Sequence, residues 1–183
     1  MVNPAHIATA RQARSEDAEA IAQVMAAVAQ ERLIGIEPPV DIAARALRFR
    51  ETIEGPGNGT LLVLERDSRV LGYAGAQETH APGVLTLAIA MLPEARGRGA
   101  GRALLDALLR HARSSGAHKL ELEVWPENSR AIALYTSAKF EVEGLRRDHY
   151  RRRDGSLRSA LLMARLLTGI TPERGQLSDP PTP

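Results

Sequence analysis

The stretch A-R-G-R-G-A-G-R-A, residues Ala95–Ala103, lies between a predicted strand and a predicted helix. Three glycines within five residues remove Cβ atoms at positions where backbone amides would approach a ligand closely. The N-terminus of the following helix adds unpaired N–H groups and the positive end of a dipole, and Arg96, Arg98 and Arg102 add fixed charge. This combination predicts a cradle for an anion, and a pyrophosphate suits it best.

Two well-known nucleotide-binding loops do not match this stretch. A Walker loop requires Lys and a hydroxyl residue after its glycines, whereas this chain continues with Arg102 and Ala103. A dinucleotide fingerprint that begins at Gly97 requires glycine at position 102, which is an arginine. The pattern that the loop does fit is R-x-x-G-x-G, over residues 96–101.

Apolar residues recur at helical spacing on the N-terminal side of the loop and predict two helices, over residues 18–28 and 41–53. The pattern then changes to apolar runs that are typical of strands. Because short connections join these runs, they predict an antiparallel meander over residues 61–64, 70–76 and 84–92.

The sequence after the loop alternates between helical and strand-like patterns. It predicts a helix over 103–116, a half-buried strand over 119–125, a helix over 128–139, and two strands over 140–150 and 157–166. We therefore expect an α/β fold, with a mixed, mostly antiparallel central sheet and helices on both faces.

The chain has 183 residues, of which 44% are hydrophobic and 25% charged, as is typical of a globular domain. We expect one domain over residues 1–167. A disordered tail is predicted over residues 168–183, because this segment holds four of the eleven prolines and almost no large apolar side chain. The absence of cysteine excludes disulfides, thiolate zinc sites and a cysteine nucleophile.

The charges are nearly balanced, with 24 Lys and Arg against 22 Asp and Glu. Neither this balance nor the 3% aromatic content favours a nucleic-acid partner. No apolar run reaches the roughly 18 residues that cross a bilayer, and the N-terminus lacks the pattern of a secretory signal. We therefore expect a cytoplasmic protein without membrane contact, and the sequence leaves both a monomer and a homodimer open.

A second motif supports a family resemblance. The stretch N-S-R-A-I-A-L-Y, Asn128–Tyr135, with Phe140 and Gly144 after it, is similar to the second coenzyme segment of the GCN5-related N-acetyltransferases (GNAT). With R-x-x-G-x-G, the chain resembles this family over about residues 7–166. The resemblance implies the GNAT fold, acetyl-CoA as acetyl donor and no metal. It implies a pyrophosphate site made by Arg96, Gly97, Arg98, Gly99, Ala100, Gly101 and Arg102, and backbone contacts to pantetheine from Ile89, Ala90 and Met91.

The resemblance also implies roles in the second motif. Asn128 would contact the cofactor, and Tyr135 would give its proton to the departing coenzyme A thiolate. A phenol with a pKa near 10 can do so while it stays protonated at neutral pH. The two residues are seven apart, so they project from one face of a helix. Alternatively, Tyr135 only packs against the core and Asn128 only caps the helix.

A base is needed for the attacking amine, and the strand over 84–92 carries no acidic residue. The candidates are Glu37, Glu78, His80, Glu123 and His149. The stretch L-E-V-W-P-E-N resembles a strand of the bacterial ribosomal-protein-alanine N-acetyltransferases, which implies that Glu123 is the proton acceptor. Glu37, in the loop over 33–40, would suit a cationic amine substrate. The alternative for Glu123 is a solvated strand carboxylate.

The acceptor stays open between a protein N-terminus and a small amine. Lys139 and Ser159 depart from the family, which usually has glycine and often aspartate there, and His149 replaces an aromatic residue of the subfamily. Residues 144–165 carry a local net charge of +5, which indicates a solvated strand face or a rim for acidic acceptors or cofactor phosphates. A non-catalytic acyl-CoA-binding module is the alternative function.

Overall fold

The computed structural model describes residues 8–56 and 59–167. Seven strands form one sheet in the order β1-β2-β3-β4-β5-β7-β6. The strands are β1 (Thr9–Gln12), β2 (Thr60–Arg66), β3 (Arg69–Glu78), β4 (Val84–Met91), β5 (Lys119–Val124), β6 (Glu141–Arg151) and β7 (Leu157–Leu166). The helices are α1 (Ala18–Ala29), α2 (Ile42–Glu54), α3 (Ala100–Ser114) and α4 (Ser129–Ser137).

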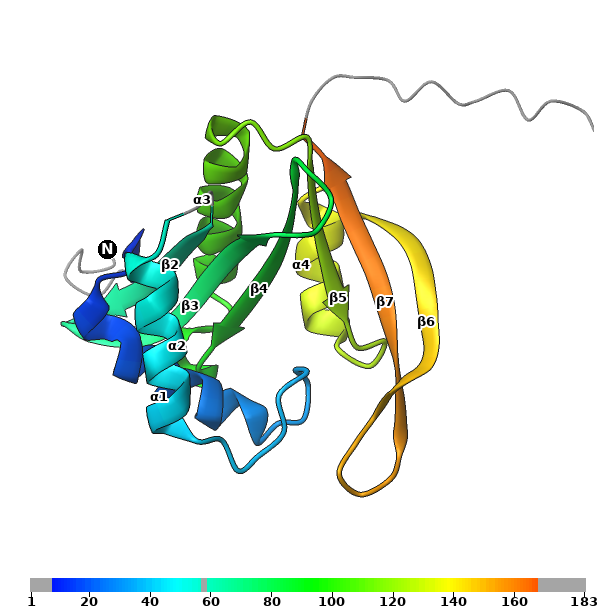
Figure 1. Ribbon diagram of the computed structural model, residues 1–183, viewed down its shortest axis with the longest axis horizontal. Coiled ribbons are helices and arrows are strands. Elements are labelled where there is room, and N and C mark those ends of the chain that lie inside the picture. Colours follow the sequence, from blue (N-terminus) through cyan, green and yellow to red (C-terminus); the bar gives the residue numbers. More distant parts are fainter. Residues whose placement is uncertain (1–7, 57–58, 168–183) are drawn as a thin grey trace, which may run out of the picture.

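Helices cover both faces of this sheet (Figure 1). The side chains of β2 show how the core divides, because Leu61 and Val63 pack in the cluster with α1 while Leu62 and Leu64 pack in the cluster with α3. Alternate residues of a strand point to opposite faces, so β2 is buried on both. All strand pairs except β4 with β5 are antiparallel. The predicted α/β fold, with its mixed, mostly antiparallel sheet, is confirmed.

The parallel pair β4 and β5 is short. Only residues 84–86 of β4 pair with residues 119–121 of β5, after which β5 continues in register with β7. Residues 87–91 of β4 therefore have β3 on one side and, among the described residues, no strand on the other. The two strands separate here, and the sheet opens at its centre (Figure 1).

The strand β1 is an element that periodicity did not predict. It pairs with β2, and Arg11 joins it to the start of α1 through hydrogen bonds of 2.7 and 2.9 Å to the Asp17 carboxylate. Asp17 is buried, and the pair with Arg11 holds the pKa of its carboxyl below the ordinary value. The stability that this pair contributes is present above the ordinary carboxyl pKa and is lost as the pH falls below it.

Two further differences concern boundaries. Helix α3 begins at Ala100, three residues before the predicted start, so its first turn includes the last glycine of the loop. The expected tail over residues 168–183 lies outside the described residues. Within the described part of the chain, no helix has the length and apolar character required to cross a membrane.

Candidate active site

The glycine loop leaves open space in front of its backbone. Gly97 and Gly99 have φ angles of +82° and +79°, and a Cβ atom built on either would meet no atom within 4 Å. Gly99 is the N-cap residue of α3, so the unpaired amides of the first helical turn begin there. A Cβ on Gly101 would lie 2.9 Å from the Met91 Cε atom, which is too close. The first two glycines expose backbone, whereas the third allows α3 to pack on β4.

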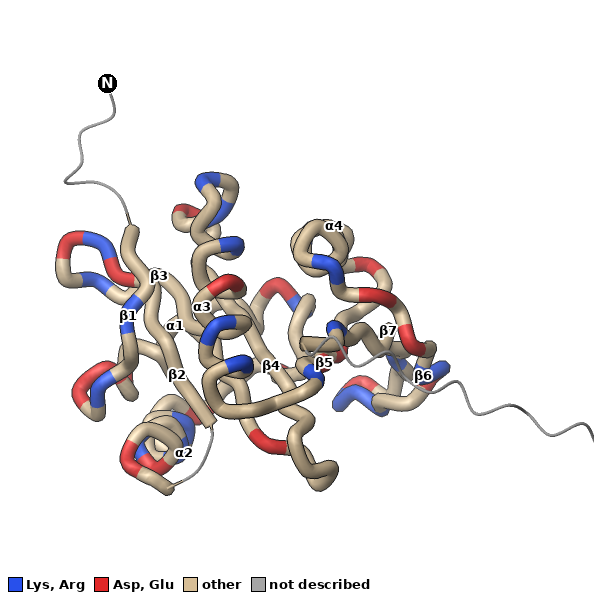
Figure 2. The backbone as a smooth tube through the Cα atoms, turned by 90° about the horizontal axis from the view of Figure 1, so that it is seen from above, with Lys and Arg blue, Asp and Glu red and all other residues tan. Residues whose placement is uncertain are grey.

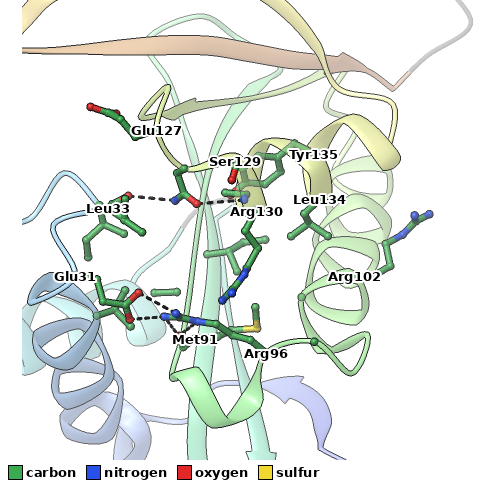
Figure 3. Close-up of a pocket in the computed structure, with 18 of the residues that line it drawn as sticks. Glu31, Leu33, Met91, Arg96, Arg102, Glu127, Ser129, Arg130, Leu134 and Tyr135 are labelled. Carbon is green, nitrogen blue, oxygen red and sulfur yellow. Dashed lines mark hydrogen bonds and ion pairs between the residues drawn. The ribbon is translucent and has the colours of Figure 1, made fainter.

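A cavity of about 510 Å³ lies between this loop, the end of β4 and the start of α4 (Figure 3). Ten of the residues predicted from the two motifs line it: Ile89, Ala90, Met91, Arg96, Gly97, Gly99, Gly101, Arg102, Asn128 and Tyr135. Arg98 and Ala100 do not line it, since Arg98 is exposed and Ala100, the first residue of α3, is buried in the core. The structure thus brings both motifs to one cavity, which we call the first cavity.

The arginines of the loop already have partners in the protein. Arg96 donates two hydrogen bonds to the Met91 carbonyl, at 2.6 and 2.9 Å, and two to the Glu31 carboxylate, at 2.6 and 2.8 Å. Arg102 forms an ion pair with Asp106 on the next helical turn. Arg96 therefore ties the loop to β4 and to the end of α1, and much of its charge is compensated.

Arg130 supplies positive charge that the prediction of site residues missed. Its side chain extends from the start of α4 toward Arg96 (Figure 3), and it lines the first cavity. No side chain within residues 8–56 and 59–167 forms an ion pair with it. Its position two residues after Asn128, within the second motif, is the signal that could have identified it.

A second cavity of about 260 Å³ adjoins the first. Its own walls include Glu123, Trp125 and Tyr150. Six residues line both cavities and mark their junction: Leu33, Ile34, Ile89, Asn128, Ala131 and Tyr135. The two cavities therefore adjoin beside Tyr135, where β4 and β5 are no longer paired.

Tyr135 is buried at this junction, with 7% of its surface exposed, and its ring packs on Phe140 at a centroid distance of 5.8 Å. Burial raises the pKa of its phenol above the ordinary value of 10. Tyr135 is therefore a protonated hydroxyl at neutral pH. Among the described residues its hydroxyl has no hydrogen-bond partner.

Glu123 projects from β5 into the second cavity, where two other residues bind its carboxylate. The Arg146 guanidinium donates to Oε1 at 2.6 Å, and the Tyr150 hydroxyl donates to Oε2. Burial, with the hydrogen bond to Glu123 as the next cause, raises the pKa of Tyr150. Tyr150 also packs edge-on against Trp125. Glu123 is exposed, and its carboxylate has one cation and one hydroxyl as partners.

Asn128 joins two elements at the junction of the cavities. Its Oδ1 atom accepts a hydrogen bond of 3.2 Å from the Ala131 amide, which is the predicted cap of α4. Its Nδ2 group donates to the Leu33 carbonyl at 3.3 Å (Figure 3). Asn128 therefore holds the loop after α1 against the start of α4.

Glu37 lies apart from these groups. It lines a different cavity beside the start of α2, where its carboxylate is 3.3 Å from Arg152 and accepts from the Arg153 amide at 3.1 and 3.3 Å. The structure therefore does not bring Glu37 together with Glu123 and Tyr135. Within the described residues, no group of three or more His, Asp or Glu side chains is placed to hold a metal ion.

Comparisons with known proteins agree on one family. The sequence model described as Acetyltransferase (GNAT) family matches residues 21–140. An L-methionine sulfoximine/L-methionine sulfone acetyltransferase of Pseudomonas aeruginosa is 30% identical over 122 residues, which cover 64% of this chain and 70% of that protein. A ribosomal protein bS18-alanine N-acetyltransferase of Escherichia coli is 41% identical over 76 residues, which cover 42% of this chain and 51%, about half, of that protein.

A solved structure extends the likeness over nearly the whole fold. It is a GNAT-superfamily phosphinothricin acetyltransferase of Sinorhizobium meliloti in complex with AcCoA. The TM-score is 0.77 and the identity 27%, with 94% of this chain and 96% of that chain covered.

Proposed function

Because this chain belongs to the acetyltransferase (GNAT) family and is an acetyl-CoA-dependent N-acetyltransferase, we propose that its two joined cavities transfer the acetyl group to a primary amine by direct attack. The membership confirms the resemblance given by the two motifs. The observation that supports the site is the junction itself, where Tyr135 lines both cavities and β4 has a free edge.

The residues of the first cavity fit coenzyme A. Left-handed glycines with open space above them, followed by the N-terminus of α3, offer backbone amides to a pyrophosphate. Arg130 and Arg96 both line the same space (Figure 3). The edge of β4 at residues 89–91 has no strand partner, so its outward backbone groups, apart from the Met91 carbonyl that Arg96 binds, are available to the amide-containing pantetheine arm.

The second cavity would hold the amine. In the proposed reaction the amine nitrogen forms a bond to the acetyl carbonyl carbon, and the bond from that carbon to sulfur breaks. Tyr135 gives its proton to the departing thiolate, and Glu123 accepts the proton that the amine loses. For Glu123 to act, one of its two contacts, with Arg146 or with Tyr150, must leave an oxygen accessible.

Two acceptor classes remain in the proposal. One named relative acts on the alanine of a ribosomal protein and the other on small amino-acid analogues, so a protein N-terminus and a small amine are both represented. A panel of peptides and small amines, with release of coenzyme A thiol and the mass of the product as readouts, tests the function. Tight binding of acetyl-CoA without thiol release across the panel would instead support the non-catalytic module.

The role of Glu123 is tested by Glu123→Gln, with Glu121→Gln on the same strand as a matched control. Because general base catalysis contributes roughly 100-fold or more, we expect the single-turnover rate to fall by about that factor in Glu123→Gln alone. Wild-type rates in Glu123→Gln between pH 6 and 9 would remove it from the mechanism.

A further inference from the structure

The second cavity offers two groups that could take a proton from the amine. Among the described residues, the titratable side chains that line it are Glu123, Tyr135 and Tyr150. Tyr135 also lines the first cavity, whereas Tyr150 does not. Since the proposed reaction uses Tyr135 for the thiolate, Glu123 and Tyr150 are left for the amine.

Both carboxylate oxygens of Glu123 already accept a hydrogen bond. Arg146 donates to Oε1 at 2.6 Å, and the Tyr150 hydroxyl donates to Oε2. For an amine that meets Glu123 directly, one of these donors must give way. A proton that passes through the Tyr150 hydroxyl reaches the same carboxylate while both bonds stay in place.

Aromatic packing positions the Tyr150 ring between the cavity and the carboxylate. The ring is half-buried and meets the buried Trp125 edge-on at a centroid distance of 5.3 Å. The His149 ring contacts it edge-on from another side, at 4.8 Å. Tyr150 thus lines the second cavity while its hydroxyl is bonded to Glu123.

The phenol has the protonation state that a relay requires. Burial, and next the hydrogen bond to Glu123, raise the pKa of Tyr150, so the phenol keeps its proton at neutral pH. A phenol oxygen can accept a hydrogen bond while it donates one. The Arg146 Nη1 atom lies 3.5 Å from this oxygen, and its charge opposes the rise in pKa. The Glu123 side chain is 33% exposed, so water can remove a proton that reaches it.

We propose that Tyr150 is a further catalytic residue, which takes the proton that the attacking amine loses and passes its own proton to Glu123. In this step an N–H bond of the amine breaks, and its proton bonds to the Tyr150 oxygen. The phenol O–H bond breaks as its proton bonds to Oε2 of Glu123. The electron pair of the N–H bond stays on nitrogen, Tyr150 ends the step neutral, and water then takes the proton from Glu123. This inference rests on the proposed function and specifies its proton path.

The variant Tyr150→Phe tests the relay, because Phe retains the ring beside Trp125 and lacks only the hydroxyl group. Single-turnover acetyl transfer is measured with the fastest acceptor of the panel of peptides and small amines. We expect the rate to fall by roughly 100-fold, as for Glu123→Gln. If Tyr150 only occupied the carboxylate, its removal would free Oε2, and the rate would stay the same or rise.

The double variant Glu123→Gln/Tyr150→Phe tests whether the two residues act on one proton. Residues that act as a unit have non-additive effects on rate, since the loss of either one closes the path. We therefore expect the double variant to be slower than wild type by the same factor of roughly 100. Two independent contributions would instead multiply to about 10,000-fold.

Tyr73→Phe is the matched control for the loss of a phenol hydroxyl. Tyr73 is buried and meets Phe49 edge-on at 5.4 Å, but it lines neither the first nor the second cavity. We expect a wild-type rate in this variant. The Kd for coenzyme A should be unchanged in Tyr150→Phe, because Tyr150 does not line the first cavity.

Two results overturn the relay and leave the proposed function intact. One is a rate in Tyr150→Phe that equals or exceeds that of the wild type while Glu123→Gln is slow, and the other is a multiplied loss in the double variant. A wild-type rate in Glu123→Gln, or failure to acetylate any amine of the panel with acetyl-CoA bound, would contradict the proposed function itself and the relay with it.

Discussion

The glycine loop over 95–103 and the hairpin of β6 and β7 are both rich in arginine, yet they use it differently. In the hairpin, five of the seven arginines bind other parts of the described chain: Arg146 pairs with Glu123, Arg152 with Glu37, Arg158 with Glu127, and Arg153 and Arg165 donate to backbone carbonyls. In the loop, Arg96 and Arg102 are also paired, but two glycines present open backbone.

This difference shows that the number of charges in a segment does not reveal what the charges bind. Figure 2 shows acidic residues interspersed with the basic ones around β5, β6 and β7, so the local +5 of residues 144–165 is largely compensated. The hairpin holds the strands and the loop after α1 in place. The glycine loop, by contrast, keeps donors available for a ligand.

The largest expected effect separates ligand binding from backbone strain. Gly99 and Gly116 lie at opposite ends of α3, both have positive φ, and neither has an atom near its Cβ position. Alanine at either site imposes the same strain, but only Gly99→Ala places a methyl group in the cradle. We expect the Kd for coenzyme A to rise about 100-fold in Gly99→Ala, which corresponds to about 2.7 kcal/mol.

Titration calorimetry measures this affinity, and Gly116→Ala is the control for strain. Equal affinities for coenzyme A in the two variants would show that the backbone around Gly99 does not bind the cofactor.

The next effect tests the structural use of charge in the hairpin. The Arg152 side chain is 10% exposed, contacts Glu37, donates to the Gly35 carbonyl at 3.1 Å and lies over the Trp125 ring. Arg152→Ala leaves a partly buried carboxylate without its cation, so we expect a loss of about 2 kcal/mol in the free energy of unfolding. Urea unfolding measures it, and the affinity for coenzyme A should stay the same.

Arg151→Ala is the matched control, since Arg151 is exposed and has no partner within the described residues. An equal loss of stability in both variants would contradict the structural role of Arg152. A weaker affinity for coenzyme A in Arg152→Ala would show that the hairpin, like the glycine loop, contributes to cofactor binding.

The smallest effect concerns left-handed backbone outside the cradle. Lys139 has a φ of +66°, so it adopts a conformation that favours the glycine usual at this position in the family. Lys139→Gly relieves about 1 to 2 kcal/mol of strain and loses part of this gain to chain entropy. We expect a net stabilisation of about 0.5 kcal/mol in thermal unfolding. A stabilisation as large in Lys139→Ala would show that strain is not the cause.

Sequence patterns predicted most of the fold, because a helix or strand that is buried on one or both faces has apolar residues at a regular spacing. The predicted strand over 157–166 matches β7 at both ends, and Asn128 caps α4 as predicted. The strand β1 has only four residues, T-A-R-Q, without apolar alternation, and its place depends on pairing with β2. The enzyme class followed from two motifs that each lie within one short stretch.

The rest of the site depends on contacts between distant segments. Glu31 binds Arg96 from 65 residues away, and Arg146 and Tyr150 reach Glu123 from 23 and 27 residues away. No local spacing encodes such pairs. For the same reason the sequence identified Glu37 by its charge and position in a loop, whereas the structure pairs it with Arg152 in another cavity.

In the proposed reaction, Tyr135 at the junction of the two cavities protonates the departing thiolate. Single-turnover acetyl transfer by Tyr135→Phe tests this role, because Phe retains the ring that packs on Phe140 and lacks only the hydroxyl group. We expect the rate to fall by roughly 100-fold or more while the Kd for coenzyme A is unchanged. A wild-type rate in Tyr135→Phe across pH 6 to 9 would show that Tyr135 does not protonate the thiolate.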